Sequence, residues 1–332
     1  MKILVTGANS TVAHSILKGL RASGLPAETF GCDINPYSPG LYRVDHAFLV
    51  KPFTDPAYEA QMLSILREHR IDLLLPAVEG ELQSLADRKE AWERETGCRI
   101  LVNSREVLDI TQDKYETARF LGARGCRVPD SAIIPEEIAA LIERVGFPLI
   151  VKPRRGATSK HVYQVQTPEE LWARFSEVPN PVVQEYLPGE EYTCGVFVDA
   201  QGTLKGIATI QRTLANGITM TALVDSFPEV EAEVRRVVEA VRPIASCNIQ
   251  LRSDREGKPT TVEINARFSS SVAIRAHFGF NEVEATLRSF LLHEAVPPMH
   301  CRPGVAMRYV NEVYIEKEEC QHLLTRGHHL PR

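Results

Sequence analysis

Two oxygen-bearing side chains stand two residues apart near the end of a strand-like segment, at Glu263 and Asn265. Because side chains at positions i and i+2 of a β-strand project to the same face, both point to one place. Gln250 lies on a strand that a turn at 254–257 would pair with this one, and it can add a third oxygen. A few oxygen donors, with room left for phosphate or water, suit Mg²⁺ or Mn²⁺ carried by a nucleotide. The sequence therefore predicts a site for a nucleotide-bound divalent cation.

Arg267 follows two residues after Asn265 and stays on the same face if the strand continues. Its planar guanidinium can then pair with a phosphate group. A pattern as short as Glu-x-Asn also occurs by accident on ordinary strands whose polar side chains face water. The metal-site interpretation therefore depends on further segments of the chain.

One such segment joins Lys152, at the end of a strand, to the small and basic loop 154–160. Gly156 lets the backbone of this loop approach a ligand, and Ser159 offers a hydroxyl beside backbone N–H donors. We expect such a loop to close over a triphosphate. The alternative is a basic loop that is simply solvated.

Another segment, 184–193, reads Gln-Glu-Tyr-Leu-Pro-Gly-Glu-Glu-Tyr-Thr and leads from one strand through a turn into the next sheet. Backbone donors and acceptors in such a hinge can read the edge of a purine base, and its carboxylates can take ribose hydroxyls. Small-molecule sites commonly lie between domains. A plain linker between two sheets is the alternative interpretation.

In the first third of the chain, short apolar strands alternate with amphipathic helices. This alternation predicts βαβ units and a parallel, doubly wound, Rossmann-like sheet that ends near residue 105. The expected strands are 2–6, 27–32, 72–75 and 99–102, and the expected helices are 10–23, 56–69 and 80–95.

Later residues change to runs of strands joined by glycine turns, which predict an antiparallel sheet. A valine stripe between residues 229 and 245 predicts a helix that packs on this sheet. The fold class is therefore mixed, α/β followed by α+β. The expected strands are 182–184, 192–198, 204–210, 218–224, 247–252, 260–264 and a closing strand at 306–315.

Composition narrows the class of partner. The net charge of −5 over 332 residues argues against a nucleic-acid footprint and against an anionic membrane surface. No apolar run has the length of about 18 residues that a membrane span needs, and the start lacks the apolar stretch of a signal peptide. Seven scattered cysteines are typical of reduced thiols. We therefore expect a cytoplasmic protein with neither a nucleic acid nor a membrane as partner.

Taken together and in this order, the segments resemble the ATP-grasp superfamily. The resemblance rests on Lys114 in Asp-Lys-Tyr, Lys152 in Val-Lys-Pro, the basic loop, the hinge and the final Glu-Ile-Asn-x-Arg. Carbamoyl-phosphate-synthase-like and amino-acid-ligase-like members are the most similar. The resemblance covers about residues 1–292 and implies a pre-ATP-grasp domain (1–110), a small lobe (111–187), a large catalytic lobe (188–300) and a C-terminal strand and tail (301–332).

The resemblance also implies a role for each matching residue. ATP phosphates would be contacted by Lys114 and Lys152, with Gly156 and Ser159 in the loop above them. The base would lie at Glu185 and Leu187, and Glu191 would bind the ribose, with Glu190 as the alternative. Gln250, Glu263 and Asn265 would hold Mg²⁺ or Mn²⁺, and Arg267 would steady the transferred phosphoryl group.

The activity that the resemblance implies is carboxylate–amine ligation. ATP phosphorylates a small-molecule carboxylate, and an amine or other nucleophile attacks the acylphosphate, with release of ADP and phosphate. Substrate contacts are expected among polar residues that are otherwise surface or salt-bridge residues. They are Arg212, Ser270, Arg275 and Glu79, with Arg308 as a further candidate. The sequence leaves a homodimer open.

Two alternatives stay within this fold. A carbamoyl-phosphate-synthase-like protein would phosphorylate bicarbonate or carbamate instead. A non-catalytic ATP-binding protein is favoured by the loop's one glycine, Gly156, and by an amide rather than a carboxylate at Gln250.

A nicotinamide-dependent oxidoreductase is the third alternative. Residues 6–13 follow a strand and open a helix, and Asp33 ends the second strand, where a ribose-binding acid would lie. However, Asn9 and Val12 occupy the later glycine positions of the dinucleotide-binding pattern, which disfavours this interpretation.

Overall fold

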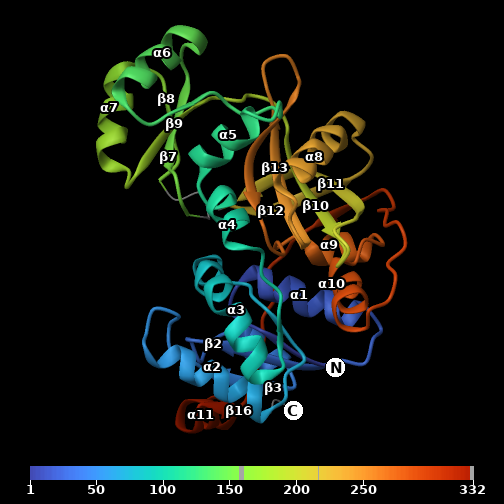
Figure 1. Cartoon of the computed structure of the whole chain (residues 1–332). Coiled ribbons are helices and arrows are strands. Elements are labelled where there is room, and N and C mark those ends of the chain that lie inside the picture. The colour runs from blue at the N-terminus through green and yellow to red at the C-terminus, as the bar shows by residue number, and fades with distance from the viewer. Residues whose placement is uncertain (157–160, 216, 330–332) are drawn as a thin grey trace.

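The structure is a computed structural model that describes residues 1–156, 161–215 and 217–329. Among these residues the chain forms three sheets, which Figure 1 shows as an N-terminal domain at the bottom, a small lobe at upper left and a large lobe on the right. The arrangement confirms the predicted Rossmann-like domain followed by two lobes.

The sheet of the N-terminal domain is parallel, with the order β3-β2-β1-β4-β5, and short β16 is added antiparallel to β3. Consecutive residues of β1 are fully buried, with Ile3 and Val5 in one apolar cluster and Leu4 in another. Burial on both faces is what a parallel sheet covered by helices requires. The strands are β1 (Lys2–Val5), β2 (Glu28–Asp33), β3 (His46–Leu49), β4 (Leu73–Leu75), β5 (Arg99–Ile100) and β16 (His328–His329).

Helices flank this sheet and begin where the sequence provides caps. The Ser10 side chain accepts a hydrogen bond from the Ala13 N–H at the start of the first helix. Gly7 turns the chain with φ 58°, and a Cβ there would lie 2.3 Å from Val78. The helices are α1 (Thr11–Ala22), α2 (Ala57–Glu68) and α3 (Leu82–Thr96), with short 3₁₀ turns η1 (Pro39–Arg43) and η2 (Glu79–Glu81).

The small lobe is an antiparallel sheet in the order β6-β9-β7-β8. Its core contains Ile138, Leu141 and Leu171, and Figure 1 shows its two helices together on one side of the sheet. The other side is therefore left to face the rest of the protein. The elements are β6 (Ser131–Ala132), β7 (Leu149–Pro153), β8 (Tyr163–Val165), β9 (Pro181–Glu185), α6 (Pro135–Val145) and α7 (Pro168–Glu177).

The large lobe is an antiparallel sheet in the order β14-β13-β10-β11-β12-β15. The predicted valine stripe lies on α8 (Pro228–Val241), which packs on one face of this sheet. The strands are β10 (Glu191–Val198), β11 (Leu204–Ala215), β12 (Ile218–Val224), β13 (Ala245–Ser253), β14 (Pro259–Asn265) and β15 (Gly304–Met307). Next to α1 lie α9 (Val272–His277) and α10 (Glu282–Thr286), which a π-helical turn, η3 (Leu287–Leu291), continues.

The remaining elements connect the domains. α4 (Arg105–Thr111) and α5 (Lys114–Gly122) lead from the N-terminal domain and pack on β14. The predicted closing strand at 306–315 is wrong beyond Met307, since residues 308–316 form neither helix nor strand. The chain then returns to the N-terminal domain through α11 (Lys317–Arg326), whose Leu323 is fully buried, and through β16.

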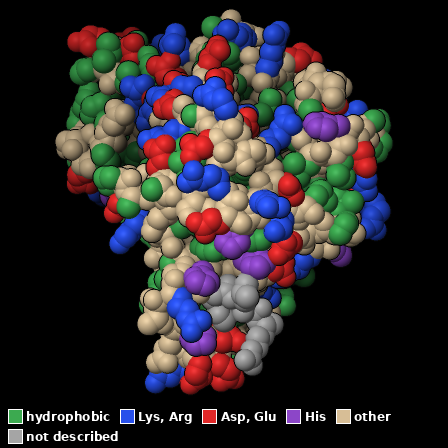
Figure 2. All heavy atoms as spheres, turned by 60° about the horizontal axis from the view of Figure 1, so that its bottom comes forward, with side chains coloured by type: hydrophobic (Ala, Val, Ile, Leu, Met, Phe, Trp, Pro, Cys, Tyr) green, Lys and Arg blue, Asp and Glu red, His purple; other side chains and the backbone are tan. Residues whose placement is uncertain are grey.

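Acidic and basic side chains are interspersed over the face shown in Figure 2. This mixture agrees with the small net charge of −5. No helix in the described part of the chain is long and apolar enough to span a membrane.

Candidate functional site

Lys152 lies near the end of β7, where the small lobe faces the large one. Burial and, to a smaller extent, the neighbouring Lys114 lower the pKa of its ammonium from 10.5 to about 8, although the Glu263 and Glu191 carboxylates act in the opposite direction. Both acids belong to strands of the large lobe. The ammonium is therefore placed among charges that come from both lobes.

The three predicted metal ligands lie on neighbouring strands of the large lobe. Gln250 on β13 is directly opposite Glu263 on β14, and directly paired residues share a face of the sheet. Asn265 lies two residues beyond Glu263, and its Nδ2 donates a hydrogen bond to Glu263 Oε1 at 3.1 Å. The structure thus brings the three oxygen-bearing side chains together.

Guanidinium groups contact the oxygens of this set. Arg212 Nη2 donates to Gln250 Oε1 at 3.0 Å and to Glu191 Oε1 at 2.7 Å. Arg267 Nη2 donates to Asn265 Oδ1 at 2.9 Å. The side-chain oxygens of Gln250 and Asn265 thus already accept hydrogen bonds from guanidinium groups, and Glu263 adds a carboxylate. Mg²⁺ prefers such oxygen ligands, so the three residues fit it.

Arg267 reaches the site by a turn and not, as expected, by continuation of the strand. β14 ends at Asn265, and the Arg267 N–H donates to the Asn265 carbonyl oxygen at 2.7 Å. The Arg267 Nε then donates to the Glu79 carboxylate of the N-terminal domain. Glu79, which the sequence suggested as a substrate contact, therefore holds Arg267 in place.

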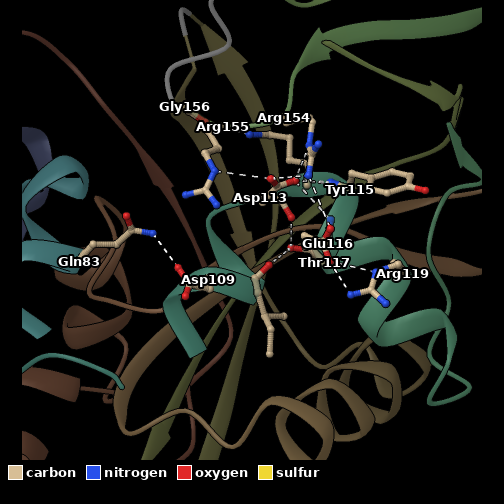
Figure 3. A network of polar contacts seen from close by, with 12 residues as sticks. Gln83, Asp109, Asp113, Tyr115, Glu116, Thr117, Arg119, Arg154, Arg155 and Gly156 are labelled. Atoms are coloured by element: carbon tan, nitrogen blue, oxygen red, sulfur yellow. Dashed lines mark hydrogen bonds and ion pairs between the residues drawn. The ribbon is translucent and has the colours of Figure 1, made fainter. Parts of the chain in front are cut away.

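Figure 3 shows that Asp113 contacts Arg154 and Arg155, the first two residues of the basic loop. The Asp113 carboxylate caps α5 and forms ion pairs with Arg154 at 2.9 Å and Arg155 at 3.5 Å. Lys114 Nζ donates to the Gly156 carbonyl oxygen at 2.9 Å. Ser159, the predicted hydroxyl of this loop, lies outside the described residues.

Sequence reasoning missed this role of Asp113. A usable signal was present, because Asp directly before a helix is a preferred N-cap residue. The pairing with the arginines could not be read from the sequence, since 41 positions separate Asp113 from Arg154, the nearer of the two along the chain.

The hinge is held between the two lobes. The Glu185 N–H donates to the Asp130 carbonyl oxygen at 2.9 Å, and burial raises the pKa of the Glu185 carboxyl. Leu187 is buried. The Gly189 N–H donates to the Ser253 carbonyl oxygen at 3.0 Å, which fixes the hinge to β13.

The structure separates the two acids that compete for the ribose role. Glu190 accepts a hydrogen bond from Gln211 Nε2 at 2.8 Å. Glu191 forms an ion pair with Arg212, whose side chain is only 7% exposed. Of the two, Glu191 shares the network of the metal-ligand candidates.

Two of the substrate candidates, Arg275 and Ser270, make contacts outside this network. Arg275 is fully buried, where its Nε donates to Glu282 Oε2 at 2.8 Å and its Nη2 to Ser269 Oγ at 3.0 Å. The expectation that it meets a substrate is therefore not supported, because this guanidinium belongs to the core. Ser270 uses its carbonyl oxygen to accept from Ser15 Oγ and from Arg308.

Arg308 and Arg212 approach one another beside β12. Burial and the charge of Arg212 lower the pKa of Arg308. No ion pair joins Arg308 to an acid in the part of the chain that the structure describes. Two guanidinium groups, of which that of Arg212 is paired with Glu191, therefore lie next to the predicted phosphate end.

Comparison with known families identifies the fold around this site. Residues 111–271 match the family described as ATP-grasp domain, and residues 3–101 match the PylC-like N-terminal domain. Residues 111–271 therefore carry an ATP-grasp domain. They include every predicted ATP and metal contact.

Individual relatives match parts of the ATP-grasp chain. D-alanine–D-alanine ligase of Porphyromonas gingivalis is 30% identical over 146 residues, which cover 41% of this chain and 41% of that protein. The arginine-specific carbamoyl phosphate synthase large chain of Bacillus subtilis is 22% identical over 262 residues, 71% of this chain and 25% of that one. The chain thus spans about two fifths of the length of the D-alanine–D-alanine ligases that it matches.

Solved structures extend the likeness to nearly the whole fold. N5-carboxyaminoimidazole synthetase of Staphylococcus aureus, solved with ADP, gives a TM-score of 0.74 at 17% identity and covers 93% of this chain and 82% of that one. L-amino acid ligase of Bacillus licheniformis gives 0.66 at 18% identity, with 85% and 72% covered. At these identities the likeness concerns the fold.

Proposed function

We propose that the protein is an ATP-dependent carboxylate–amine ligase that forms an acylphosphate and releases ADP and phosphate. The observation that carries the proposal is the position of Lys152 of the small lobe, whose ammonium feels the charges of Glu263 and Glu191 of the large lobe. A half-buried ammonium near these carboxylates is suited to a metal-bound triphosphate. The named relatives include ligases that join a carboxylate to an amine, which supports this reaction type.

Each side chain has a defined task in this proposal. Lys152 and Lys114 neutralise phosphate oxygens, and the hinge at Glu185 and Leu187 lies along the base. Gln250, Glu263 and Asn265 hold Mg²⁺ or Mn²⁺, which when bound neutralises charge on the terminal phosphates. Phosphoryl transfer needs positioning and charge compensation more than covalent help, so Arg267 suffices to steady the transferred group.

We assign the acid substrate to the two guanidinium groups of Arg212 and Arg308. A bound cation would take the Gln250 oxygen, and Arg212 would lose that hydrogen bond. Its guanidinium would then be available, together with Arg308, to bind a carboxylate in the two-pronged manner that arginine favours. The amine or other nucleophile would attack the carboxyl carbon of the acylphosphate and displace phosphate.

The test is release of ADP from Mg-ATP against a panel of amino acids and other small carboxylates, with hydroxylamine present to trap an acylphosphate. Acid-dependent ADP release and hydroxamate formation are expected. Glu263→Gln and Glu191→Gln should abolish or strongly reduce release, whereas Glu190→Gln, whose partner is Gln211, should keep it. AMP as the product would exclude the proposed chemistry, and ATP binding without turnover would make the protein a non-catalytic ATP-binding protein.

Bicarbonate is the second candidate acid. It is favoured by the length of the match to the carbamoyl phosphate synthase large chain, 71% of this chain. ADP release that depends on bicarbonate, and that no amino acid increases, would establish carbamoyl-phosphate-synthase-like phosphorylation instead.

We further propose a cytoplasmic location, which the seven unpaired cysteines support. The homodimer that the sequence left open is to be decided by light scattering of the purified chain. A mass near 37.1 kDa indicates a monomer, and twice that mass a homodimer.

A further inference from the structure

Arg252 lies on β13 beside the candidate site, and no sequence motif marks it. It is directly opposite Glu191 of β10, and Gln250 is opposite Thr193 in the same ladder. Since side chains alternate along a strand, Gln250 and Arg252 project to the same face, whereas Leu251 between them is buried in the core against α8. The guanidinium therefore lies on the face of the sheet that bears Gln250, opposite to the face covered by α8.

The hydrogen bonds of Arg252 are incomplete. Its Nη2 donates to the Gly189 carbonyl oxygen at 3.2 Å, which holds the guanidinium against the hinge. Its Nε is buried and has no hydrogen-bond partner among the described residues. A buried donor without an acceptor is costly and uncommon, so an acceptor is expected from a bound molecule.

The charge of Arg252 is also uncompensated. The nearest acid in register, Glu191, is engaged by Arg212 at 2.7 Å, and no described carboxylate forms an ion pair with Arg252. The positive charge of Arg252 acts on the Lys152 ammonium, so the two cations face the same space. An anion in this space would compensate both.

Position along the strand indicates which part of an anionic ligand Arg252 would meet. Gln250, at the metal end, is two residues away, or about 7 Å. Glu191, at the proposed ribose, is directly across the ladder. The group that lies between the terminal phosphates and the ribose of a nucleotide is the α-phosphate.

We propose that Arg252 is a further nucleotide-binding residue, which donates its Nε–H to an oxygen of the α-phosphate of bound ATP and supplies a positive charge there. The inference rests on the proposed nucleotide site but not on the ligase reaction. Because AMP, ADP and ATP all have an α-phosphate, this residue next to the hinge would compensate the negative charge of that phosphate in each of them.

The test is calorimetric binding of adenosine, AMP and ADP without an acid substrate. Arg252→Gln should weaken AMP and ADP by about ten- to a hundredfold, the usual effect of a lost charge-assisted hydrogen bond, and leave adenosine unchanged. Arg252→Lys, which keeps the charge but not the planar fork, should lie between. Arg235→Gln, on the exposed side of α8, is the matched control and should change nothing.

Two results would overturn the inference. Equal weakening of adenosine and AMP would mean that the guanidinium lies on the base and not on the α-phosphate. Unchanged binding of all nucleotides in both Arg252 variants would remove the residue from the site. If the wild-type chain bound no nucleotide at all, the proposed site itself would fail, and this outcome is distinct from a site that binds nucleotides without using Arg252.

Discussion

Arg267 Nε donates to the carboxylate of Glu79, although 188 positions separate the two residues. Arg267 follows the strand that bears Glu263 and Asn265, and Glu79 belongs to the N-terminal domain. Gln112 Nε2 donates to Glu79 Oε1 at 3.1 Å and supports it from the connecting segment. The N-terminal domain therefore orients a side chain of the proposed catalytic site.

Replacing Glu79 by Gln should lower kcat by about tenfold and leave the affinity for ATP nearly unchanged, because only the orientation of Arg267 is disturbed. Arg267→Ala should lower kcat by at least a hundredfold, since it removes charge at the transferred group. Steady-state ADP release measures both. A Glu79→Gln enzyme with wild-type kcat would show that the ion pair is dispensable.

Asp113 combines a helix cap with two ion pairs, and substitution can separate these roles. Asp113→Ser keeps a capping oxygen but loses the pairs with Arg154 and Arg155, so it should raise the KM for ATP severalfold. Asp113→Ala should have the same effect on KM and also lower the free energy of unfolding by about 1 kcal/mol through loss of the cap. Urea unfolding measures the stability of the two variants, and the dependence of ADP release on ATP concentration measures their KM. Equal unfolding free energies would contradict the capping role.

Lys152 should make ATP binding depend on pH. Burial lowers the pKa of this ammonium to about 8, so it is charged below that pH and becomes neutral above it. The Kd for ATP should be constant below about pH 7 and rise above about pH 8 by up to tenfold per pH unit. In Lys152→Arg the charge persists and the curve should be flat. Identical pH curves for the two proteins would assign the dependence to another group.

Glu81 should make stability fall as the pH rises. Burial raises the pKa of its carboxyl from 4.5 to about 7, although Thr6 and Tyr58 donate hydrogen bonds to it. Between these values the folded state retains a proton that the unfolded state has lost, so the free energy of unfolding decreases with pH there, by about 3 kcal/mol in total, and is constant above about pH 7. Glu81→Gln should remove this decrease. Urea unfolding from pH 5 to pH 8 measures it, and parallel curves for both proteins would contradict it.

Arg275 and Glu282 should behave as a structural pair. Both side chains are fully buried, so Arg275→Met leaves an unpaired carboxylate in the core and should cost about 3–5 kcal/mol of unfolding free energy. The double variant with Glu282→Leu should recover much of this loss, because no charge remains buried. Chemical denaturation of the wild-type protein, Arg275→Met, Glu282→Leu and the double variant tests this. A double variant as unstable as the sum of the single ones would exclude the pairing as the cause.

Local signals in the sequence predicted much of the fold. The strand expected at 218–224 coincides with β12, and the valine stripe correctly placed α8 on the large sheet. The alternation of short apolar strands and helices correctly gave the parallel sheet. These elements are determined by burial periodicity, which neighbouring residues reveal.

Features that depend on distant partners could not be predicted. β16 has only two residues, and its pairing with β3 joins opposite ends of the chain. The turn that returns Arg267 to Asn265, and the burial of Arg275 beside Gly195, arise from packing between elements. For the site, residue types and order predicted the candidate ligands, but not that Arg212 would contact both Glu191 and Gln250.

The return of the chain to the first sheet affects how the domains can move. The large lobe is joined to the N-terminal domain on its incoming side through α4 and α5, and on its outgoing side through α11 and β16. The packing of α1 against α9 and α10 adds a direct contact between the two. We therefore expect these two domains to move as one body. We expect an opening that admits a nucleotide to occur at the small lobe, which would carry Lys152 toward and away from the candidate oxygen ligands.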